Sequence, residues 1–485
     1  MKLSLKNSST QLNATILGKT ENQFSDLITD SRGGGNFGDS LFIAIKTNRN
    51  NGHRFIAQMY EKGVRSFLIS EKEINTKDFP EAGFLLVENT LDALQKLATY
   101  KRSLFKKPVI AITGSNGKTI VKEWLNQLLQ KDFVICRSPK SFNSQIGVPL
   151  SVWGLNENQT LAIFEAGISQ PGEMEKLQKI ILPTLGIITN IKAAHDEHFL
   201  NRLQKAQEKV KLFVGCEEIF YCSDHPEINE ALNAEEFSEI TKYSWGKNIE
   251  ADLHIESIVK EILITKISGV YIGEKIQIQI PFTDEASIEN AIHCWLYLLE
   301  SGIGNAVIQE RMKELAPVAM RLELKQAVNN CSVINDSYNS DIESLSIALD
   351  FLNRQQQHPK KTIILSDILQ SGKKEIELYF EIGQLLKAKK IDRLIGIGES
   401  ISKNESRFDC EKEFFPTTEA FLKNYSPSKF SNEAILLKGS RNFSFEKIGI
   451  LLQQKSHDTV FEFSLNNLVH NLNYYRGLLK PGAGI

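Results

Sequence analysis

The stretch Val109-Ile110-Ala111-Ile112-Thr113-Gly114-Ser115-Asn116-Gly117-Lys118-Thr119 is the most informative part of the chain. Its apolar first half predicts a buried strand, and the pattern that begins at Lys118 predicts a helix. Glycines between a strand and a helix let backbone N–H groups face an anion, and the helix start adds partial positive charge. Lys118 can reach terminal phosphates, and the Thr119 hydroxyl can bind magnesium. We therefore expect ATP to bind at Gly114, Ser115, Asn116, Gly117, Lys118 and Thr119.

A tight glycine turn that binds no nucleotide is the alternative interpretation of this stretch. The general phosphate-loop pattern also has a glycine at position 112, where this chain has Ile112. Lys118 and Thr119 nevertheless stand in the register that a phosphate loop requires, which favours nucleotide binding.

Length and composition describe an ordinary globular protein. A chain of 485 residues indicates about three domains, since single cores rarely exceed ~250 residues. The net charge of −2 gives no electrostatic reason to expect nucleic acid or an anionic membrane as a partner. No apolar run approaches the ~20 residues of a membrane span. The six cysteines are scattered without a C-x-x-C pair, which predicts a reducing compartment, the cytoplasm.

Strand and helix signals alternate along most of the chain, which predicts an α/β fold with parallel sheets. We expect a mixed α/β N-terminal domain over residues 1–106 and a central parallel-sheet ATPase domain over 107–314. A Rossmann-like C-terminal domain should follow over 315–455, and residues 456–485 form a separate segment. Within the central domain, two alternating runs, 262–267 and 275–280, predict a small antiparallel insertion.

Polar residues follow two further predicted strands of the central domain. Glu165 closes the run 161–164, and His195 follows the run 185–194. Ligands collect at the carboxyl ends of strands in open α/β sheets, so Glu165 could share a magnesium ion with Thr119. A solvated carboxylate is the alternative. His195 and His198 have H-x-x-H spacing, but no further Cys or His lies nearby, so magnesium or substrate is favoured over zinc.

Lys209 lies in a helical pattern over residues 204–213. Lysines on helices are usually solvated, and physics alone gives no other interpretation. Lys205 and Lys211 lie in the same pattern and are competing candidates for any role given to Lys209.

Several motifs together resemble the Mur ligase family. They are the short phosphate loop 113–119, the segment 145–150 after Asn143, and the block 165–173 that begins with Glu165. The family couples ATP hydrolysis to amide bond formation. The resemblance implies that Lys118, Lys209 and His195 are catalytic. It further implies that Lys209 is carbamylated and that Thr119, Glu165, His195 and Lys209 hold two magnesium ions.

The resemblance assigns further residues by their place in the family motifs. It implies ATP contacts at Asn290, Arg321, Asp336 and Tyr338, and substrate contacts at Asn143, Asn339, Lys438, Ser440 and Arg441.

The N-terminal pattern narrows the expected substrates. Ser31 and Arg32, the run 38–44 and the triplet 51–53 resemble the domain that holds the UDP end of a UDP-N-acetylmuramoyl peptide. No Asp-Asn-Pro-Arg sequence of the kind used for a diamino acid is present. The resemblance therefore implies that D-alanyl-D-alanine is joined to UDP-N-acetylmuramoyl-tripeptide.

Residues 457–485 do not continue the ligase pattern. A short strand and a helix with one apolar face resemble the opening of alanine racemase, ahead of the lysine that would bind pyridoxal phosphate. We expect a ligase fused to a racemase domain and cut short, without pyridoxal phosphate or racemase activity. The alternative is a native cap packed on the ligase.

Three other functions remain open at this point. The chain could be a Mur ligase that adds a single amino acid, or a phosphate-loop kinase of a nucleotide-linked substrate. It could also be a nucleotide-gated scaffold without catalysis. A phosphate-loop kinase would not need the final α/β domain or the N-terminal pattern, which counts against the kinase interpretation.

Overall fold

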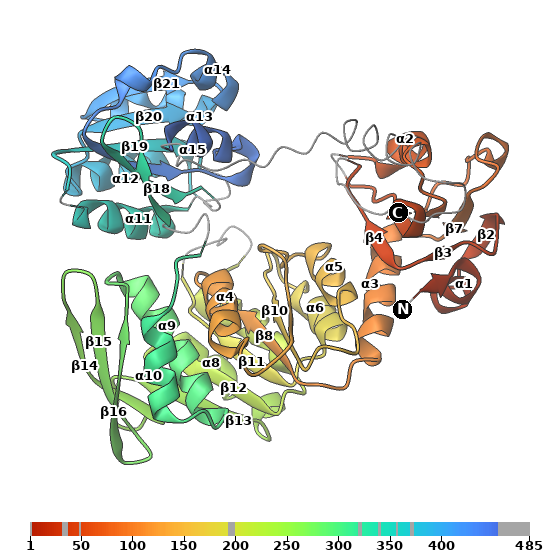
Figure 1. Ribbon diagram of the computed structural model, residues 1–485, viewed down its shortest axis with the longest axis horizontal. Helices are drawn as coiled ribbons and strands as arrows, with labels where there is room; N and C mark the ends of the chain where they lie inside the picture. The colour runs from red at the N-terminus through yellow and green to blue at the C-terminus, as the bar shows by residue number, and fades with distance from the viewer. Residues whose placement is uncertain are drawn as a thin grey trace, which may run out of the picture.

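The computed structural model describes residues 2–31, 37–47, 50–192, 199–318, 323–337, 341–355, 357–368 and 373–453. They form three α/β units, each with its own sheet (Figure 1). The predicted α/β class with mainly parallel sheets is confirmed, while the domain boundaries stay predictions. The segment 456–485, with its racemase-like pattern, lies outside the described residues.

The N-terminal unit contains a five-stranded sheet in the order β2-β7-β6-β5-β4. Four of its strands are parallel, and β2 pairs with β7 in the antiparallel sense. The small pair β1–β3 lies beside it. The strands are β1 (Leu3–Ser4), β2 (Thr15–Gly18), β3 (Gln23–Phe24), β4 (Asp26–Ile28), β5 (Ser40–Ile43), β6 (Ser66–Ile69) and β7 (Gly83–Leu86), and the helices are α1 (Leu5–Leu12), α2 (Ile56–Glu61) and α3 (Thr90–Ser103).

The central unit contains a nine-stranded sheet in the order β16-β15-β14-β13-β12-β11-β8-β10-β9. The strands from β9 to β14 along this order are parallel, and β14, β15 and β16 pair in the antiparallel sense. They are β8 (Val109–Thr113), β9 (Ile135–Arg137), β10 (Leu161–Glu165), β11 (Leu185–Ile188), β12 (Glu218–Cys222), β13 (Thr241–Gly246), β14 (Leu253–Lys260), β15 (Thr265–Tyr271) and β16 (Glu274–Ile280). The predicted antiparallel insertion is therefore an extension of the main sheet, and it begins with β14, which the sequence pattern did not indicate.

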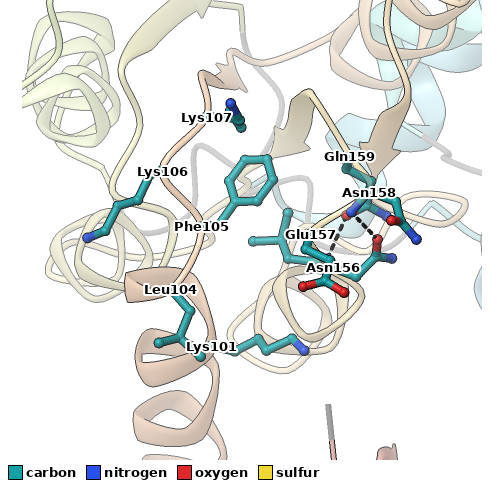
Figure 2. A pocket seen from close by; sticks show the side chains of 10 residues that line it. Lys101, Leu104, Phe105, Lys106, Lys107, Asn156, Glu157, Asn158 and Gln159 are labelled. Carbon is teal, nitrogen blue, oxygen red and sulfur yellow. Dashed lines mark hydrogen bonds between the residues drawn. The ribbon is translucent and has the colours of Figure 1, made fainter.

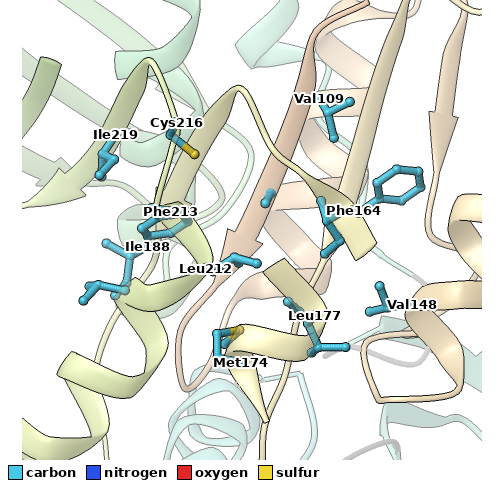
Figure 3. Packing of buried hydrophobic residues seen from close by; sticks show 14 of the residues in the cluster. Val109, Val148, Phe164, Met174, Leu177, Ile188, Leu212, Phe213, Cys216 and Ile219 are labelled. Carbon is cyan, nitrogen blue, oxygen red and sulfur yellow. The ribbon is translucent and has the colours of Figure 1, made fainter. Parts of the chain in front are cut away.

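Helices cover both faces of the central sheet: α4 (Lys118–Leu129), α5 (Gly147–Trp153), α6 (Met174–Ile181), α7 (Arg202–Val210), α8 (Pro226–Leu232), α9 (Glu285–Glu300) and α10 (Asn305–Lys313). Successive side chains of β8 point to opposite faces, so Val109 and Ala111 join one buried cluster and Ile110 and Ile112 the other. Figure 3 shows the first cluster, where Val109 and Phe164 pack with Leu177 of α6. Burial on both faces fixes β8 and its carboxyl end inside the central unit.

The C-terminal unit contains a six-stranded sheet in the order β17-β18-β22-β19-β20-β21, in which only β17 is antiparallel to its neighbour. The strands are β17 (Glu323–Ala327), β18 (Cys331–Asp336), β19 (Lys360–Ser366), β20 (Arg393–Ile397), β21 (Glu411–Phe415) and β22 (Glu433–Lys438). The helices are α11 (Ile342–Arg354), α12 (Glu375–Ala388), α13 (Glu399–Lys403), α14 (Thr418–Lys423) and α15 (Glu446–Leu452). None of the helices that the structure describes has the length and apolar character needed to cross a bilayer.

Candidate active site

The phosphate loop connects β8 to α4, as the sequence predicted. Gly114 has φ +137° and Gly117 has φ +85°, a region that side chains other than glycine rarely adopt. A Cβ atom would lie 2.0 Å from Thr189 Oγ1 at Gly114 and 2.1 Å from Asn290 Oδ1 at Gly117. Both glycines are therefore required by conformation and by space.

The end of the neighbouring strand β11 holds this loop in place. The backbone N–H of Ser115 donates to the Asn190 carbonyl (2.7 Å), and that of Asn116 donates to Asn190 Oδ1 (3.0 Å). The Thr189 hydroxyl donates to the Asn116 carbonyl at 2.6 Å. Sequence reasoning did not assign a role to Thr189 or Asn190, although both follow a buried strand as Glu165 does.

Lys118 folds back over its own loop. Its ammonium donates to the carbonyl oxygens of Gly114 (2.7 Å) and Ser115 (2.9 Å). A phosphate group bound at the loop would offer this ammonium a charged acceptor in place of two neutral ones, and hydrogen bonds to charged groups are stronger.

Thr119 and Glu165 form the pair that the sequence predicted for a metal ion. The Thr119 hydroxyl donates to Glu165 Oε2 at 2.8 Å and lies 2.9 Å from the Ser141 hydroxyl. Glu165 is fully buried, and its Oε1 atom has no hydrogen-bond partner. Magnesium prefers hard oxygen ligands, so a buried carboxylate oxygen without a hydrogen bond beside two hydroxyls fits the ion.

No group of three His, Cys, Asp or Glu side chains suited to a metal occurs within the part of the chain that the structure describes. A metal at Glu165 would therefore draw its other ligands from hydroxyls, substrate oxygens and water, as magnesium commonly does in phosphate sites.

Lys209 of α7 faces the same loop. Its side chain is buried, and its ammonium lies 3.1 Å from the Gly114 carbonyl oxygen. Burial, and then the charges of Lys118 and Lys205, lower the Lys209 pKa well below its usual value. A lysine in this setting can be a neutral amine, which is the form that reacts with carbon dioxide.

The two competing lysines have other partners. Lys205 donates to the Lys192 carbonyl. Lys211 forms ion pairs with Glu175 (2.8 Å) and Glu208 (3.0 Å). Of the three, Lys209 is the one that lines a cavity beside the phosphate loop.

This cavity has a volume of about 360 Å³ and lies between the phosphate loop and the start of α3. Lys118 and Lys209 line it together with Asn143, the residue predicted to face substrate. The Gly167 N–H donates to the Asn143 carbonyl at 2.8 Å, which ties the Asn143 segment to the end of β10. The structure thus brings Lys118, Asn143 and Lys209 into one space.

Asn290 of α9, a predicted ATP contact, is buried beside Gly117 of the phosphate loop. The preceding residue, Glu289, accepts from Asn190 Nδ2 (2.9 Å) and lies 3.7 Å from Lys192 and 3.5 Å from His225. Burial alone would raise the Glu289 pKa, but His225, Lys192 and Asn190 lower it to about 2. No role for Glu289 was predicted from the sequence.

His293, one helical turn further along α9, was also not identified. It is buried, and burial lowers its pKa to about 4. Trp245 Nε1 donates to its Nδ1 (3.1 Å), so Nε2 carries the proton that is donated to the Thr189 carbonyl at 2.9 Å. A neutral imidazole therefore connects α9 to the strand end that holds the phosphate loop.

Three predicted residues of the C-terminal unit, Asp336, Lys438 and Ser440, lie at or just beyond the carboxyl ends of parallel strands. Lys438 Nζ donates to Asp336 Oδ2 at 2.6 Å, and both side chains are buried. The Ser440 N–H donates to the Ser366 hydroxyl at 3.0 Å, while the buried Ser440 hydroxyl has no hydrogen-bond partner. These residues belong to a different sheet from the phosphate loop.

In the N-terminal unit, Ser31 is buried and its carbonyl accepts from Lys62 at 2.6 Å. His53 is held by two neighbours: its Nδ1 lies 2.8 Å from Asn51 Oδ1, and its Nε2 accepts from the Ser70 N–H at 2.9 Å. These contacts hold Ser31 and the triplet 51–53, two parts of the N-terminal pattern from which substrate binding was predicted.

Five predicted site residues lie outside the described residues: Arg32, His195, Arg321, Tyr338 and Asn339. The backbone of Arg441 is described, but its side chain is not.

A second pocket, of about 630 Å³, lies at the linker between α3 and β8. Figure 2 shows the Phe105 ring between Lys106 and the turn 156–159. The Asn156 N–H donates to Gln159 Oε1 at 2.7 Å and closes that turn. None of the residues predicted for the site lines this pocket.

Comparison with known proteins decides the family. The Mur ligase middle domain matches residues 112–298, and the Mur ligase, glutamate ligase domain matches residues 320–441. A UDP-N-acetylmuramoyl-tripeptide–D-alanyl-D-alanine ligase of Rickettsia prowazekii is 31% identical over 421 residues, which cover 84% of the chain and 91% of that relative. The chain belongs to the Mur ligase family.

Other Mur ligases resemble the chain over most of its length. A Bacillus subtilis relative with the same ligase name is 28% identical over 416 residues, which cover 84% of the chain and 89% of that relative. The crystal structure of MurF from Acinetobacter baumannii matches with a TM-score of 0.76 and 22% identity, covering 93% of this chain and 99% of the other. The structure of MurF ligase from Thermotoga maritima, solved in complex with ADP, matches with a TM-score of 0.69 and 21% identity over 88% and 96% of the two chains. The three-unit fold is thus that of this Mur ligase group.

Proposed function

We propose that the chain is an ATP-dependent ligase that joins D-alanyl-D-alanine to UDP-N-acetylmuramoyl-tripeptide. The observation that carries the proposal is the cavity shared by Lys118, Asn143 and Lys209, next to the buried pair of Thr119 and Glu165. A phosphate loop and a substrate-facing segment thereby open on one space. The relatives' names supply the two substrates.

The chemistry needs activation of a carboxylate, because a free carboxylate has no usable leaving group for attack by an amine. An oxygen of the tripeptide carboxylate attacks the γ-phosphorus of ATP, and ADP leaves. The amine of the dipeptide then attacks the carbonyl carbon of the acyl phosphate, loses a proton and expels inorganic phosphate. Lys118, whose ammonium contacts the loop carbonyls, would neutralise charge on the transferred group.

The metal and carbamate assignments belong to the same proposal. Thr119 and Glu165 would hold one magnesium ion, which would neutralise phosphate charge during transfer. Carbamylated Lys209 and His195 would hold a second. The burial of Lys209 and its lowered pKa support the modification, because a neutral amine can add carbon dioxide and lose a proton to give an anionic carbamate.

The remaining predicted contacts divide by ligand. Asn290, Arg321, Asp336 and Tyr338 would bind ATP, and Ser31 and Arg32 would hold the UDP end of the precursor. The other substrate contacts would be Asn143, Asn339, Lys438, Ser440 and Arg441. The buried Ser440 hydroxyl without a partner supports a polar ligand near the Lys438 segment.

We also propose a cytoplasmic location. All six cysteines are free thiols, five of them buried, and ATP and nucleotide sugars are available in that reducing compartment.

The test is phosphate release by the purified chain with each muramoyl peptide and each amino substrate, with ADP measured in parallel. The proposal predicts release only when ATP, the tripeptide precursor and D-alanyl-D-alanine are all present. A stable phosphorylated product formed without the dipeptide would indicate a kinase. Turnover with a single amino acid would indicate a different Mur ligase reaction.

A further inference from the structure

A buried lysine lies beneath the phosphate loop and has no part in the proposed chemistry. Lys122 follows Lys118 by one turn of α4, and its side chain is 0% exposed. Lysine is almost never fully buried unless its charge is paired and its donors are satisfied. The groups that contact the Lys122 ammonium should therefore show why a charged side chain is buried here.

Two of these contacts are backbone carbonyls in the loop between β9 and α5. Lys122 Nζ donates to the Ser138 carbonyl at 2.7 Å and to the Lys140 carbonyl. Lys140 itself has φ +52°, an uncommon conformation for a residue with a side chain. Lys122 thus fastens a loop in an unusual conformation to the phosphate-loop helix, and the next residue, Ser141, contacts Thr119.

The other contacts are carboxylates. Lys122 Nζ lies 3.1 Å from Glu123 Oε1 and 3.7 Å from Glu165 Oε1. The Glu165 atom is the one without a hydrogen bond, and the side chains of Lys122 and Glu165 are both 0% exposed. A buried carboxylate without compensating charge is strongly destabilising, so the nearby ammonium stabilises it through charge rather than through a hydrogen bond.

We propose that Lys122 is a resident counter-ion for Glu165 that takes the electrostatic place of a metal ion while the site is metal-free. This inference rests on the proposed function, in which Thr119 and Glu165 hold magnesium. Lys122 is then a positioning residue with two effects. It keeps the Thr119, Ser141 and Glu165 oxygens together without metal, and it weakens binding of Mg²⁺ alone, so that the metal is retained when nucleotide phosphates add negative charge.

The first experiment measures the ion pair in metal-free protein with a double-mutant cycle. Urea midpoints are compared for the wild type, Lys122→Met, Glu165→Gln and the double variant in EDTA. Lys122→Met should lower the midpoint, and adding Glu165→Gln to it should recover a large part of the loss. Lys131→Met is the matched control, because Lys131 lies on the surface, 63% exposed and 3.9 Å from Glu314.

Additive effects of the two substitutions would contradict the proposal, because a lysine that only fastens loop carbonyls gains nothing from removal of the Glu165 charge. Lys122→Met alone could fail to fold. In that case a folded double variant would support the proposal, and failure of the double variant to fold would overturn it.

The second experiment titrates Mg²⁺ without nucleotide and follows both calorimetry and the urea midpoint. Removal of a cation 3.7 Å from Glu165 should tighten Mg²⁺ binding several-fold in Lys122→Met and should reduce its stability deficit. Equal or weaker Mg²⁺ binding by Lys122→Met would contradict the counter-ion role. Equal Mg²⁺ binding by the wild type and Glu165→Gln would instead contradict the proposed metal site, and the metal-free cycle would still decide the ion pair.

Discussion

The Thr119 hydroxyl donates to the Glu165 carboxylate across 2.8 Å and joins two residues that are 46 positions apart in the chain. The bond connects the first turn of α4 to the carboxyl end of β10, a neighbour of β8 in the sheet. Both side chains are buried. A hydroxyl and a buried carboxylate are thereby held together at the end of the phosphate loop.

Lys118→Ala should abolish ADP formation while the protein stays folded. The substitution removes the ammonium that lies over the phosphate loop, and we expect a loss of at least about 100-fold in kcat. ADP release at saturating substrates is the measurement. Lys131→Ala removes an exposed lysine from the other end of the same helix region and should leave kcat unchanged, whereas near wild-type activity of Lys118→Ala would contradict the assignment.

Lys209→Ala should lose most activity and regain part of it when a short carboxylic acid is added. The acid can occupy the space of the missing carbamate and supply oxygen ligands. Lys211→Ala is the control, because Lys211 pairs with Glu175 and Glu208 instead of lining the cavity. Full activity of Lys209→Ala without any added acid would exclude a carbamate at this position.

Gly117→Ala should weaken ATP binding far more than backbone strain alone can explain. The new Cβ would lie 2.1 Å from Asn290 Oδ1, and the residue would keep φ +85°. Gly215→Ala is a close match, with φ +83° and no atom within 4 Å of the new Cβ, so it reports the strain of roughly 1–2 kcal/mol by itself. The urea midpoint should fall in both variants and further in Gly117→Ala, while the affinity for an ATP analogue, measured by calorimetry, should fall only in Gly117→Ala. Equal urea midpoints of the two variants would contradict the role of the Asn290 contact.

Stability should fall as the pH is lowered from 6.5 towards 4 because of His293. Burial lowers its folded-state pKa from 6.5 to about 4, so the unfolded chain binds a proton in this window that the folded chain does not. The stabilisation is fully present well above pH 6.5, and about 2 kcal/mol of it should be lost by pH 5. Urea midpoints measured at several pH values check this. His293→Gln should flatten the dependence of the midpoint on pH, and an unchanged dependence in that variant would show that another group causes it.

The phosphate loop could be predicted from sequence because its signals are local. Gly114, Gly117, Lys118 and Thr119 stand next to one another, and both glycines have the conformation that the pattern requires. The α/β class was equally accessible, because strands and helices alternate. Glu165 was found from a general rule about the ends of parallel strands.

Several site residues could not be predicted, because their roles depend on which strands pair in the sheet. Thr189 and Asn190 support the loop only because β11 pairs with β8, an order that no local pattern specifies. Lys122 has the spacing of an ordinary helix lysine, and its burial follows from the loop after β9 closing over it. The strand β14 was missed because six of its eight side chains are exposed or half-exposed, so its apolar pattern is weak.

The most direct test of the central claim, that the peptide carboxylate is phosphorylated by ATP, follows the carboxylate oxygen. UDP-N-acetylmuramoyl-tripeptide labelled with ¹⁸O in its terminal carboxylate is turned over with ATP and D-alanyl-D-alanine, and the released phosphate is analysed by mass spectrometry. The account predicts that each phosphate carries one ¹⁸O atom from the carboxylate. Unlabelled phosphate, formed at the same rate as the amide, would contradict it.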